Sequence, residues 1–430
     1  MRQYIKNSMW VLIEKLVRLS VIFCFFSFVS QKLSVYDFGI FSLSQTITTL
    51  IIGVVAFGLD NVLIKEFSSS EKINKIFATA IFFRLALSLL AVILLILFFS
   101  LSEYEFIYKL VFVASSLSII FQTQTIYYSY YQAVSKSVII TKTSLFALMI
   151  SSAIKILLLY FNAGMVFYAL SFSLDYLLSF LCIYYISHKY ERCLNFGFNN
   201  FDLRLLKELI RQSLPILIST IIIMIYTRID QFMIARYLGI EQVAIFSVAV
   251  RISDAYMFIP MAISASFLPM VSKEPTKENI QKYFDLTHFF TIASAIFVIA
   301  LVPVVVNLFF GERYVSSIHT VYIIVIANVV SALGAVSSNV LIVRDLSYLR
   351  IYRAVYGLVI NVLLNIYMIP NYGIIGAAYS SLLSQIIAAW LANFLSINTR
   401  DLFFWQSRSI FTFGILTMKG VLKELNQKRL

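Results

Sequence analysis

About a dozen apolar stretches, each about 20 residues long, follow one another along the chain with only short polar breaks between them. A helix of about 20 residues is needed to cross a hydrocarbon core about 30 Å thick. The composition agrees, since 60% of the residues are hydrophobic and 13% are charged, whereas a typical soluble domain has about 25% charged residues. The sequence therefore predicts an all-α polytopic membrane protein with about 12 transmembrane helices. We place these helices at residues 9–30, 38–60, 77–99, 108–127, 138–160, 165–187, 214–235, 242–270, 288–310, 318–342, 351–370 and 374–396.

The net charge of +13 is distributed unevenly between the polar breaks. When the N-terminus is placed in the cytosol, basic residues gather in the cytosolic breaks and are scarce in the opposite ones. The cytosolic breaks contain, among others, Lys65, Lys72, Lys75, Lys136, Lys142, Arg204, Lys207, Lys273, Lys277, Arg344, Arg350 and Arg353. This asymmetry follows the positive-inside rule and predicts that both termini are cytosolic. Because topology explains the positive charge, we expect no nucleic-acid partner.

The longest cytosolic connection, residues 188–213, divides the chain into two sets of six predicted helices. We expect an N-lobe at 1–187, a C-lobe at 214–396 and a cytosolic or interfacial tail at 397–430, with a short thirteenth span as the alternative for the tail. Within the connection, Phe201–Leu209 is predicted to form a short amphipathic helix that lies on the membrane surface.

The two halves of the chain resemble each other. Leu33–Ser42 aligns with Leu238–Ser247, and Asn162–Gly164 aligns with Asn371–Gly373, at nearly the same offset. Because each half has an even number of spans, both halves enter the membrane from the same side. This arrangement predicts two parallel six-helix repeats around a central cavity, with alternating access by rocking of one lobe against the other.

Several charged residues fall inside the predicted spans, where each charge costs at least about 2.5–3.5 kcal/mol at the bilayer centre. They are Glu14, Lys15, Arg18, Asp60, Arg84, Lys155, Asp175, Arg228, Asp230, Arg251 and Asp254. Glu14 and Arg18 are four residues apart and can pair on one helix face. Arg251 and Asp254, which are three residues apart, can do the same. Each remaining charge needs a partner on another helix or contact with water.

The deeper charges favour a water-filled cavity between the lobes over buried structural ion pairs. They are Arg18, Asp175, Arg228, Asp230, Arg251 and Asp254. Arg228 and Asp230 are two residues apart, so they point in different directions and need partners on other helices. Asp60, Arg84 and Lys155 lie closer to span ends, where snorkelling to the interface is an equally open alternative.

Arginine's planar fork suits two-point contacts with phosphate or carboxylate groups. A cavity that contains arginines and carboxylates can therefore hold an anionic headgroup while the carboxylates titrate or bind a coupling cation.

Catalytic chemistry finds no support in the sequence. The three cysteines, Cys24, Cys182 and Cys193, have no metal-ligand spacing and no obvious disulfide framework. No nucleophile–base constellation, metal-ligand spacing or glycine-rich phosphate loop is present. We therefore expect no catalytic residues, no metal, no cofactor and no enzymatic activity.

Three stretches of the chain carry a family resemblance. The first is Tyr36–Phe41 followed by Phe57–Asp60, the second is Ile229–Gly239 running into Ala244–Ala249, and the third is Pro370–Ala378. With these motifs the chain resembles the polysaccharide transporter family, and within it the O-antigen flippases. Their superfamily also contains the multidrug and toxin extrusion exporters. The likeness extends over nearly the whole chain in span count and loop lengths.

The resemblance implies a flippase of the bacterial inner membrane, built from two six-helix bundles. Such proteins move a polyprenyl-diphosphate-linked oligosaccharide, an O-antigen or capsule repeat unit, from the cytosolic to the periplasmic leaflet. The implied partners are this lipid-linked glycan, membrane lipid, H⁺ or Na⁺ as the coupling ion, and polysaccharide polymerase and assembly proteins.

A cationic lumen receives the diphosphate and sugar in this family. By position, we expect the substrate-binding residues to be Arg18, Arg228 and Arg251, followed by Arg84 and Lys155. The residues expected to serve coupling or ion pairing are Glu14, Asp60, Asp175, Asp230 and Asp254. Two alternatives stay open: a multidrug exporter of the same fold, and an O-antigen polymerase or ligase. The second usually carries a large periplasmic loop, whereas every outer break here is short.

Overall fold

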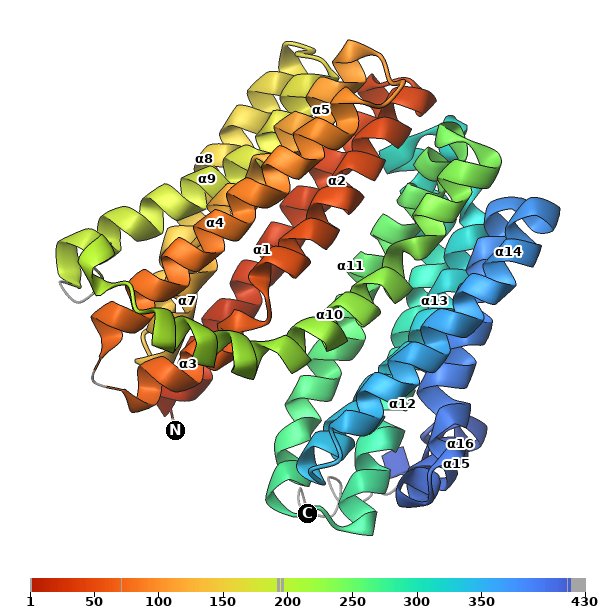
Figure 1. Cartoon of the computed structure of the whole chain (residues 1–430). Helices are drawn as coiled ribbons and strands as arrows, with labels where there is room; N and C mark the ends of the chain where they lie inside the picture. Colours follow the sequence, from red (N-terminus) through yellow and green to blue (C-terminus); the bar gives the residue numbers. More distant parts are fainter. Residues whose placement is uncertain (1, 71, 192–193, 195–196, 416, 419–430) are drawn as a thin grey trace. The chain divides into compact units, whose positions relative to one another are not determined.

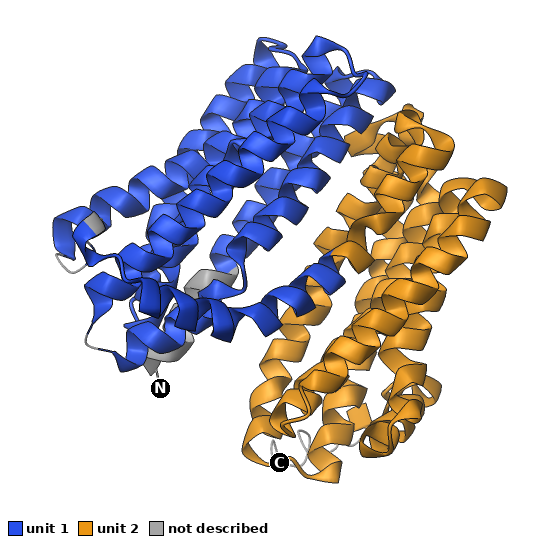
Figure 2. Ribbon diagram, viewed as in Figure 1, with its two compact units in different colours: residues 1–224 blue, residues 225–430 orange. Residues whose placement is uncertain are grey.

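A computed structural model of the chain consists of helices joined by short connections (Figure 1). It describes residues 2–418, except 71, 192–193, 195–196 and 416, and for residues 2–12 and 198 it describes the backbone alone. Cys193 and the predicted tail beyond residue 418 lie outside the described residues. The chain divides into two compact units, residues 1–224 and residues 225–430 (Figure 2).

Unit 1 begins with α1 (Arg2–Lys32), α2 (Val35–Ala56), α3 (Leu59–Ser69) and α4 (Ile73–Ser100). It continues through α5 (Phe106–Ser116), α6 (Ser118–Phe121), α7 (Gln124–Ala133), α8 (Ser137–Tyr160), α9 (Met165–Tyr190) and the short 3₁₀ helix η1 (Phe198–Asn200). It ends within α10 (Leu203–Leu238), whose last residues belong to unit 2.

Unit 2 contains α11 (Ile240–Lys273), α12 (Lys277–Val305), the π-helix η2 (Val306–Phe310), the 3₁₀ helix η3 (Glu312–Tyr314) and α13 (Ser317–Val343). It continues with α14 (Tyr348–Gln385), the π-helix η4 (Ile386–Leu391), α15 (Ala392–Leu395), the 3₁₀ helix η5 (Ile397–Thr399) and α16 (Arg400–Thr412).

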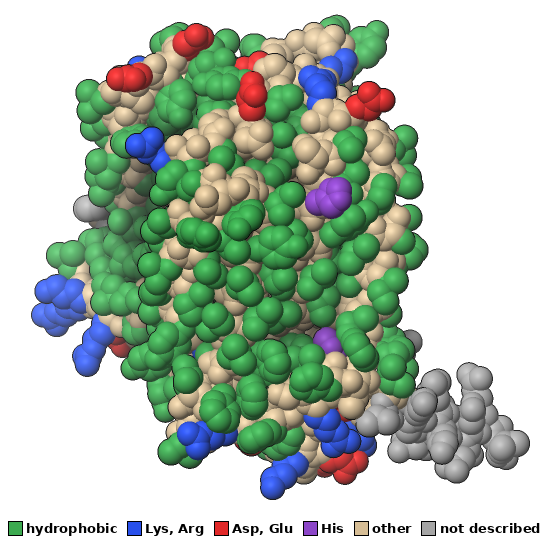
Figure 3. All heavy atoms as spheres, turned by 90° about the vertical axis from the view of Figure 1, so that its right-hand side faces the viewer, with side chains coloured by type: hydrophobic (Ala, Val, Ile, Leu, Met, Phe, Trp, Pro, Cys, Tyr) green, Lys and Arg blue, Asp and Glu red, His purple; other side chains and the backbone are tan. Residues whose placement is uncertain are grey.

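The helices confirm the predicted all-helical polytopic architecture. Ten segments of the described chain are long and apolar enough to cross a membrane. The last of them, Tyr348–Leu395, is bent at Gly373 (φ 63°, ψ −147°), so it covers two of the predicted spans. The first predicted span lies within α1, a helix of 31 residues that is not among the ten. Figure 3 shows hydrophobic side chains over the middle of one face and charged side chains toward its two ends, as expected for a membrane-spanning protein.

The helix predicted at residues 201–209 is not a separate element in the structure. From Leu203 onward it is the start of α10, which continues through Pro215 to Leu238. A proline removes one backbone hydrogen bond and can bend a helix without ending it. Just before α10, the Asp202 carboxylate accepts hydrogen bonds from the backbone N–H groups of Leu205 (3.3 Å) and Arg204 (2.9 Å). These two bonds, that of Leu205 first, hold the pKa of Asp202 below its usual range.

The first part of the predicted tail is packed into unit 2. Leu402 of α16 is fully buried in a core cluster that also contains Val271 of α11 and Leu333 of α13. At the start of α16, Asp401 forms an ion pair with Arg344 (2.7 Å). Residues 400–412 are therefore an integral helix of this unit.

A break between α2 and α3 shapes the packing of α10 in unit 1. The chain takes left-handed φ values at Phe57 (55°) and Gly58 (67°) before α3 begins at Leu59. A Cβ atom on Gly58 would lie 2.8 Å from Cβ of Ile216 in α10. Gly58 is therefore required both by its backbone conformation and by the close approach of α10.

Two glycine substitutions at this contact should have different effects on stability. Gly58→Ala should destabilise the protein by about 1–3 kcal/mol, because the strained φ and the clash with a branched Cβ both oppose it. Gly53→Ala is the matched control: its Cβ would meet only the flexible end of Met224, and alanine favours the helix by about 0.5–1 kcal/mol. The measurement is the apparent unfolding temperature in detergent. Equal stability of the two variants would contradict this account of the break.

Candidate functional site

Unit 2 contains a polar cavity of about 280 Å³ between α10, α11, α13 and α14. Three of the predicted site residues meet there: Arg228 and Asp230 from α10, and Asp254 from α11. They are joined by polar residues that include Ser253, Asn328, Ser331, Ser381 and Gln385. The cavity thus gathers side chains that lie more than 100 residues apart in the sequence.

Arg228 and Asp254 form an accessible ion pair in this cavity. Nη2 of Arg228 lies 2.9 Å from Oδ2 of Asp254, and the two side chains are 28% and 48% exposed. This ion pair joins α11 to α10. An exposed pair of this kind contributes little to stability, so its arginine can exchange partners.

Asp230 is buried and is held by neutral groups. Nδ2 of Asn365 donates to its Oδ1 (2.6 Å), and the hydroxyl of Ser381 donates to its Oδ2 (2.5 Å). The same amide of Asn365 also donates to Oδ1 of Asn361 (3.0 Å). Within the described chain no basic side chain forms an ion pair with Asp230. The prediction that Arg228 and Asp230 would find partners on other helices is confirmed for both residues.

Arg18 in unit 1 pairs along its own helix, as predicted. Its Nε donates to Oε1 of Glu14 (2.7 Å). Ser144 of α8 closes the group, since its hydroxyl donates to the same Glu14 oxygen (2.6 Å) and also contacts Nη2 of Arg18. Arg18 keeps 30% of its side chain exposed.

Lys155 and Asp175 form a buried ion pair in unit 1. Nζ of Lys155 lies 2.5 Å from Oδ2 of Asp175, and it also lies 5.1 Å from the centre of the Phe25 ring. The adjoining cavity is only about 20 Å³ and is also lined by Gln45. The water-filled environment predicted for Asp175 and the snorkelling alternative for Lys155 are both wrong, because each charge is neutralised by the other.

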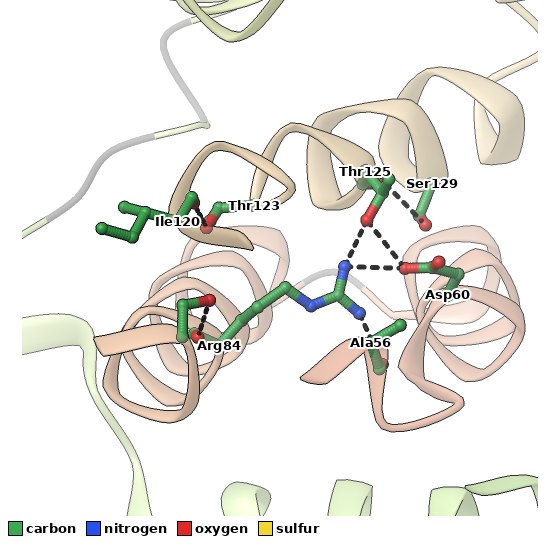
Figure 4. A network of polar contacts seen from close by, with 8 residues as sticks. Ala56, Asp60, Arg84, Ile120, Thr123, Thr125 and Ser129 are labelled. Carbon is green, nitrogen blue, oxygen red and sulfur yellow. Dashed lines mark hydrogen bonds and ion pairs between the residues drawn. The ribbon is translucent and has the colours of Figure 1, made fainter. Parts of the chain in front are cut away.

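Arg84 is fully buried at the α2–α3 break (Figure 4). Its Nη1 donates to Oδ1 of Asp60 (2.8 Å) and to the hydroxyl of Thr125, and its Nη2 donates to the backbone oxygen of Ala56 (2.7 Å). The Thr125 hydroxyl also donates to Asp60 (3.1 Å). Snorkelling is therefore wrong for Arg84. Its guanidinium ties α4 to the end of α2, to α3 and to α7.

Arg353 was assigned to a cytosolic break, and this assignment is wrong. It is buried in α14, where its Nε donates to the backbone oxygen of Ala388 (3.0 Å) and its Nη1 to Ser337 (3.0 Å). Asp285 on α12 is a second buried charge that the sequence analysis missed; it accepts hydrogen bonds from Gln281 (2.8 Å) and Thr417 (2.6 Å). No local pattern of charges marks either residue as buried.

Comparison with known proteins places this geometry in a family context. Residues 4–275, more than half of the chain, match the family model described as "Polysaccharide biosynthesis protein". A probable flippase, AglR, of Haloferax volcanii is 28% identical over 180 residues, which cover 39% of this chain and 37% of that protein. A putative O-antigen transporter of Shigella flexneri is 25% identical over 185 residues, 41% of this chain and 44% of that protein. The matched part thus spans less than half the length of either relative.

Solved transporter structures share the fold. A lipid II flippase, MurJ, in an inward closed conformation superposes with a TM-score of 0.74 at 17% identity, over 96% of this chain and 93% of that chain. An inward-facing multidrug transporter of the MATE family and MOP superfamily superposes with a TM-score of 0.64 at 16% identity, over 93% of this chain and 95% of that chain. At these identities the likeness establishes a shared fold alone.

Removing Asp60 should be more harmful than removing both members of its ion pair. Asp60→Ala leaves the buried Arg84 without a counter-charge and should destabilise the protein by about 3 kcal/mol, the lower end of the range for such losses. The lower end applies because Asp60 itself is 41% exposed. The double variant Asp60→Ala/Arg84→Met removes the stranded charge and should recover part of the loss.

The measurement is again the apparent unfolding temperature in detergent. As the control, Glu278→Ala breaks the exposed Glu278–Lys282 pair (2.7 Å) and should leave the unfolding temperature unchanged, since exposed pairs contribute little. A double variant less stable than Asp60→Ala alone would contradict this account of the Arg84–Asp60 ion pair.

Proposed function

The chain belongs to the polysaccharide biosynthesis protein family, and on that basis we propose that it is a flippase for a polyprenyl-diphosphate-linked oligosaccharide, an O-antigen or capsule repeat unit. The observation that carries the proposal is the accessible Arg228–Asp254 pair in a polar cavity of a membrane-spanning unit. The relatives named as a flippase and as an O-antigen transporter point the same way.

Diphosphate recognition is proposed for three arginines. Among the described residues, Arg228 is held only by a half-exposed carboxylate, so a diphosphate can replace Asp254 as its partner through a two-point contact. Arg18, also partly exposed, and Arg251 on α11 are the further candidates. We do not propose diphosphate binding for Arg84 and Lys155, because both are buried in ion pairs within unit 1.

Ion coupling is proposed for Asp230. Its carboxylate, the Ser381 hydroxyl and the Asn365 amide form a set of oxygen ligands, and Oδ1 of Asn365 is buried without a hydrogen-bond partner in the described structure. Oxygen ligands of this type suit a hard cation such as Na⁺. Alternatively, the carboxylate can take up a proton. Either ion would neutralise the buried charge.

The chain is a multi-pass membrane protein. We place it in the bacterial inner membrane with both termini cytosolic, and we propose that the N-lobe (1–187) and the C-lobe (214–396) rock against each other to give alternating access to a central cavity. Polysaccharide polymerase and assembly proteins would use the translocated glycan.

A multidrug exporter of the same fold is the second candidate. An exporter of cationic drugs would be expected to keep a carboxylate of its cavity free for the drug, whereas Asp254 is paired with Arg228 in this cavity. The other carboxylate of the lining, Asp230, is held by Asn365 and Ser381, so neither carboxylate is left free for a cationic drug.

Loss of this protein should trap lipid-linked oligosaccharide on the cytosolic leaflet. Cells without the gene should accumulate complete polyprenyl-diphosphate oligosaccharide units, measured by mass spectrometry with sidedness checked in spheroplasts. Arg228→Ala should lower complementation about ten- to hundredfold, as expected for the loss of a charge-assisted contact. Arg228→Lys should retain part of the activity because it keeps the charge.

The control for this experiment is Lys282→Ala, which removes a basic side chain that lies outside the proposed site and should complement fully. Full complementation by Arg228→Ala would contradict the role of Arg228. Unchanged lipid-linked sugars after deletion would contradict the flippase and favour drug efflux, which drug susceptibility of the same cells would reveal.

Asp230→Asn should uncouple transport from the ion gradient. Asparagine keeps the shape and one oxygen of the side chain but cannot carry the charge that a proton or Na⁺ neutralises. In proteoliposomes, an imposed H⁺ or Na⁺ gradient should stimulate transport of lipid-linked oligosaccharide by the wild type and fail to stimulate the variant. Asp345→Asn is the control, because Asp345 is exposed in a turn with φ 58°, a conformation that asparagine also tolerates. Equal stimulation of Asp230→Asn and wild type would contradict the coupling role.

A further inference from the structure

The charges that line the unit 2 cavity favour a diphosphate only at Arg228. Its lining contains one guanidinium, from Arg228, and two carboxylates, from Asp230 and Asp254. A diphosphate can contact Arg228 when Asp254 releases it, but the remainder of the lining would repel further negative charge. Of the groups in a lipid-linked oligosaccharide, an uncharged sugar therefore suits the space beside Arg228 better than further phosphate does.

Unpartnered polar side chains line this space. The side chains of Gln385 (α14) and Ser331 (α13) both face the cavity, and neither forms a hydrogen bond with the described residues. Asn328 donates its amide to Ser253, to the backbone oxygen (3.2 Å) and to the hydroxyl (2.6 Å), which leaves its amide oxygen as an acceptor. Donors and acceptors left without partners in a concave site are the usual means of fixing a polar ligand.

Apolar side chains complete the lining, among them Phe246 and Met257 of α11. A sugar ring presents both kinds of surface, hydroxyl groups at its edge and C–H groups on its faces. The volume of about 280 Å³ falls just below the range of about 300–1,000 Å³ for pockets that hold drug-sized ligands. The cavity is therefore large enough for a single ring and too small for an oligosaccharide.

We propose that this cavity binds the sugar that is attached directly to the diphosphate, with Gln385, Ser331 and Asn328 contacting its hydroxyl or acetamido groups. This inference rests on the proposed flippase function. It follows from the continuity of the site, because a diphosphate bound to Arg228 places the adjoining sugar next to the cavity that Arg228 lines. The rest of the glycan lies outside the cavity, so the subsite selects the first sugar and tolerates variation beyond it.

The test compares lipids with and without that sugar. The full chain in nanodiscs is titrated with farnesyl diphosphate and with farnesyl diphosphate bearing one glucosyl, galactosyl or N-acetylglucosaminyl group, and binding is measured by native mass spectrometry. The wild type should bind at least one of the sugar-bearing lipids more tightly than farnesyl diphosphate. Gln385→Leu, which loses the amide at similar volume, should reduce that preference about 3- to 10-fold, the effect of one or two hydrogen bonds, without changing the affinity for farnesyl diphosphate.

A second variant and a control distinguish the loss of sugar binding from misfolding. Ser331→Phe fills the cavity and should also abolish the preference for sugar while farnesyl diphosphate still binds. Gln132→Leu replaces an exposed glutamine of α7 in unit 1 and should behave as the wild type. The unfolding temperature of each variant is measured alongside.

The outcomes separate the subsite from the flippase proposal. If the wild type binds all four lipids equally, or if folded Gln385→Leu and Ser331→Phe keep the full preference, the sugar subsite is overturned while diphosphate recognition stands. If the wild type binds none of the lipids, the proposed function itself is contradicted, and the subsite with it.

Discussion

Every charge placed inside a membrane-spanning protein must be neutralised by a partner, by dipoles or by water, because hydrocarbon offers none of these. The protein meets this constraint in two ways. In unit 1, Arg84 and Lys155 are buried against carboxylates. In unit 2, the Arg228–Asp254 pair stays accessible and Asp230 is held by neutral amide and hydroxyl groups. Charges of the first kind fix the helices, whereas those of the second kind can change partners.

This difference separates architecture from activity within one set of intramembrane charges. Removing one member of a buried pair strands the other in a low-dielectric environment, so such pairs are poor candidates for an exchange with substrate. The Arg84–Asp60 pair illustrates this, because the Arg84 guanidinium also donates to the backbone oxygen of Ala56 at the end of α2 (2.7 Å). A half-exposed pair loses little when water or a phosphate replaces one partner. The exposure of a charged side chain in the structure, more than its distance from the ends of a predicted span, therefore identifies the charges that can bind an anionic headgroup.

Hydropathy and local spacing predicted the parts of the structure that are local. The spans followed from apolar length, and the Glu14–Arg18 pair followed from a separation of four residues on one helix. Pairing across helices could not be predicted, because Asp230 meets an amide 135 residues away and Arg84 meets a carboxylate 24 residues away. The positive-inside pattern also misplaced Arg353. The sequence near the end of a span is the same whether the side chain of a basic residue faces water or packs among the helices.

Arg353 shows how an unpaired guanidinium is stabilised without a carboxylate. Within the described chain it binds backbone oxygens, among them that of Ala388 (3.0 Å) in the π-helix η4. A π-helix shifts the hydrogen-bond register and leaves carbonyl groups available to outside donors. Gln406 of α16 donates to the neighbouring backbone oxygen of Ala389 (2.9 Å). The helix α16, which lies in the segment predicted to be a tail, therefore helps to stabilise η4. Because η4 begins directly after Gln385, these contacts hold the register of the helix that lines the unit 2 cavity.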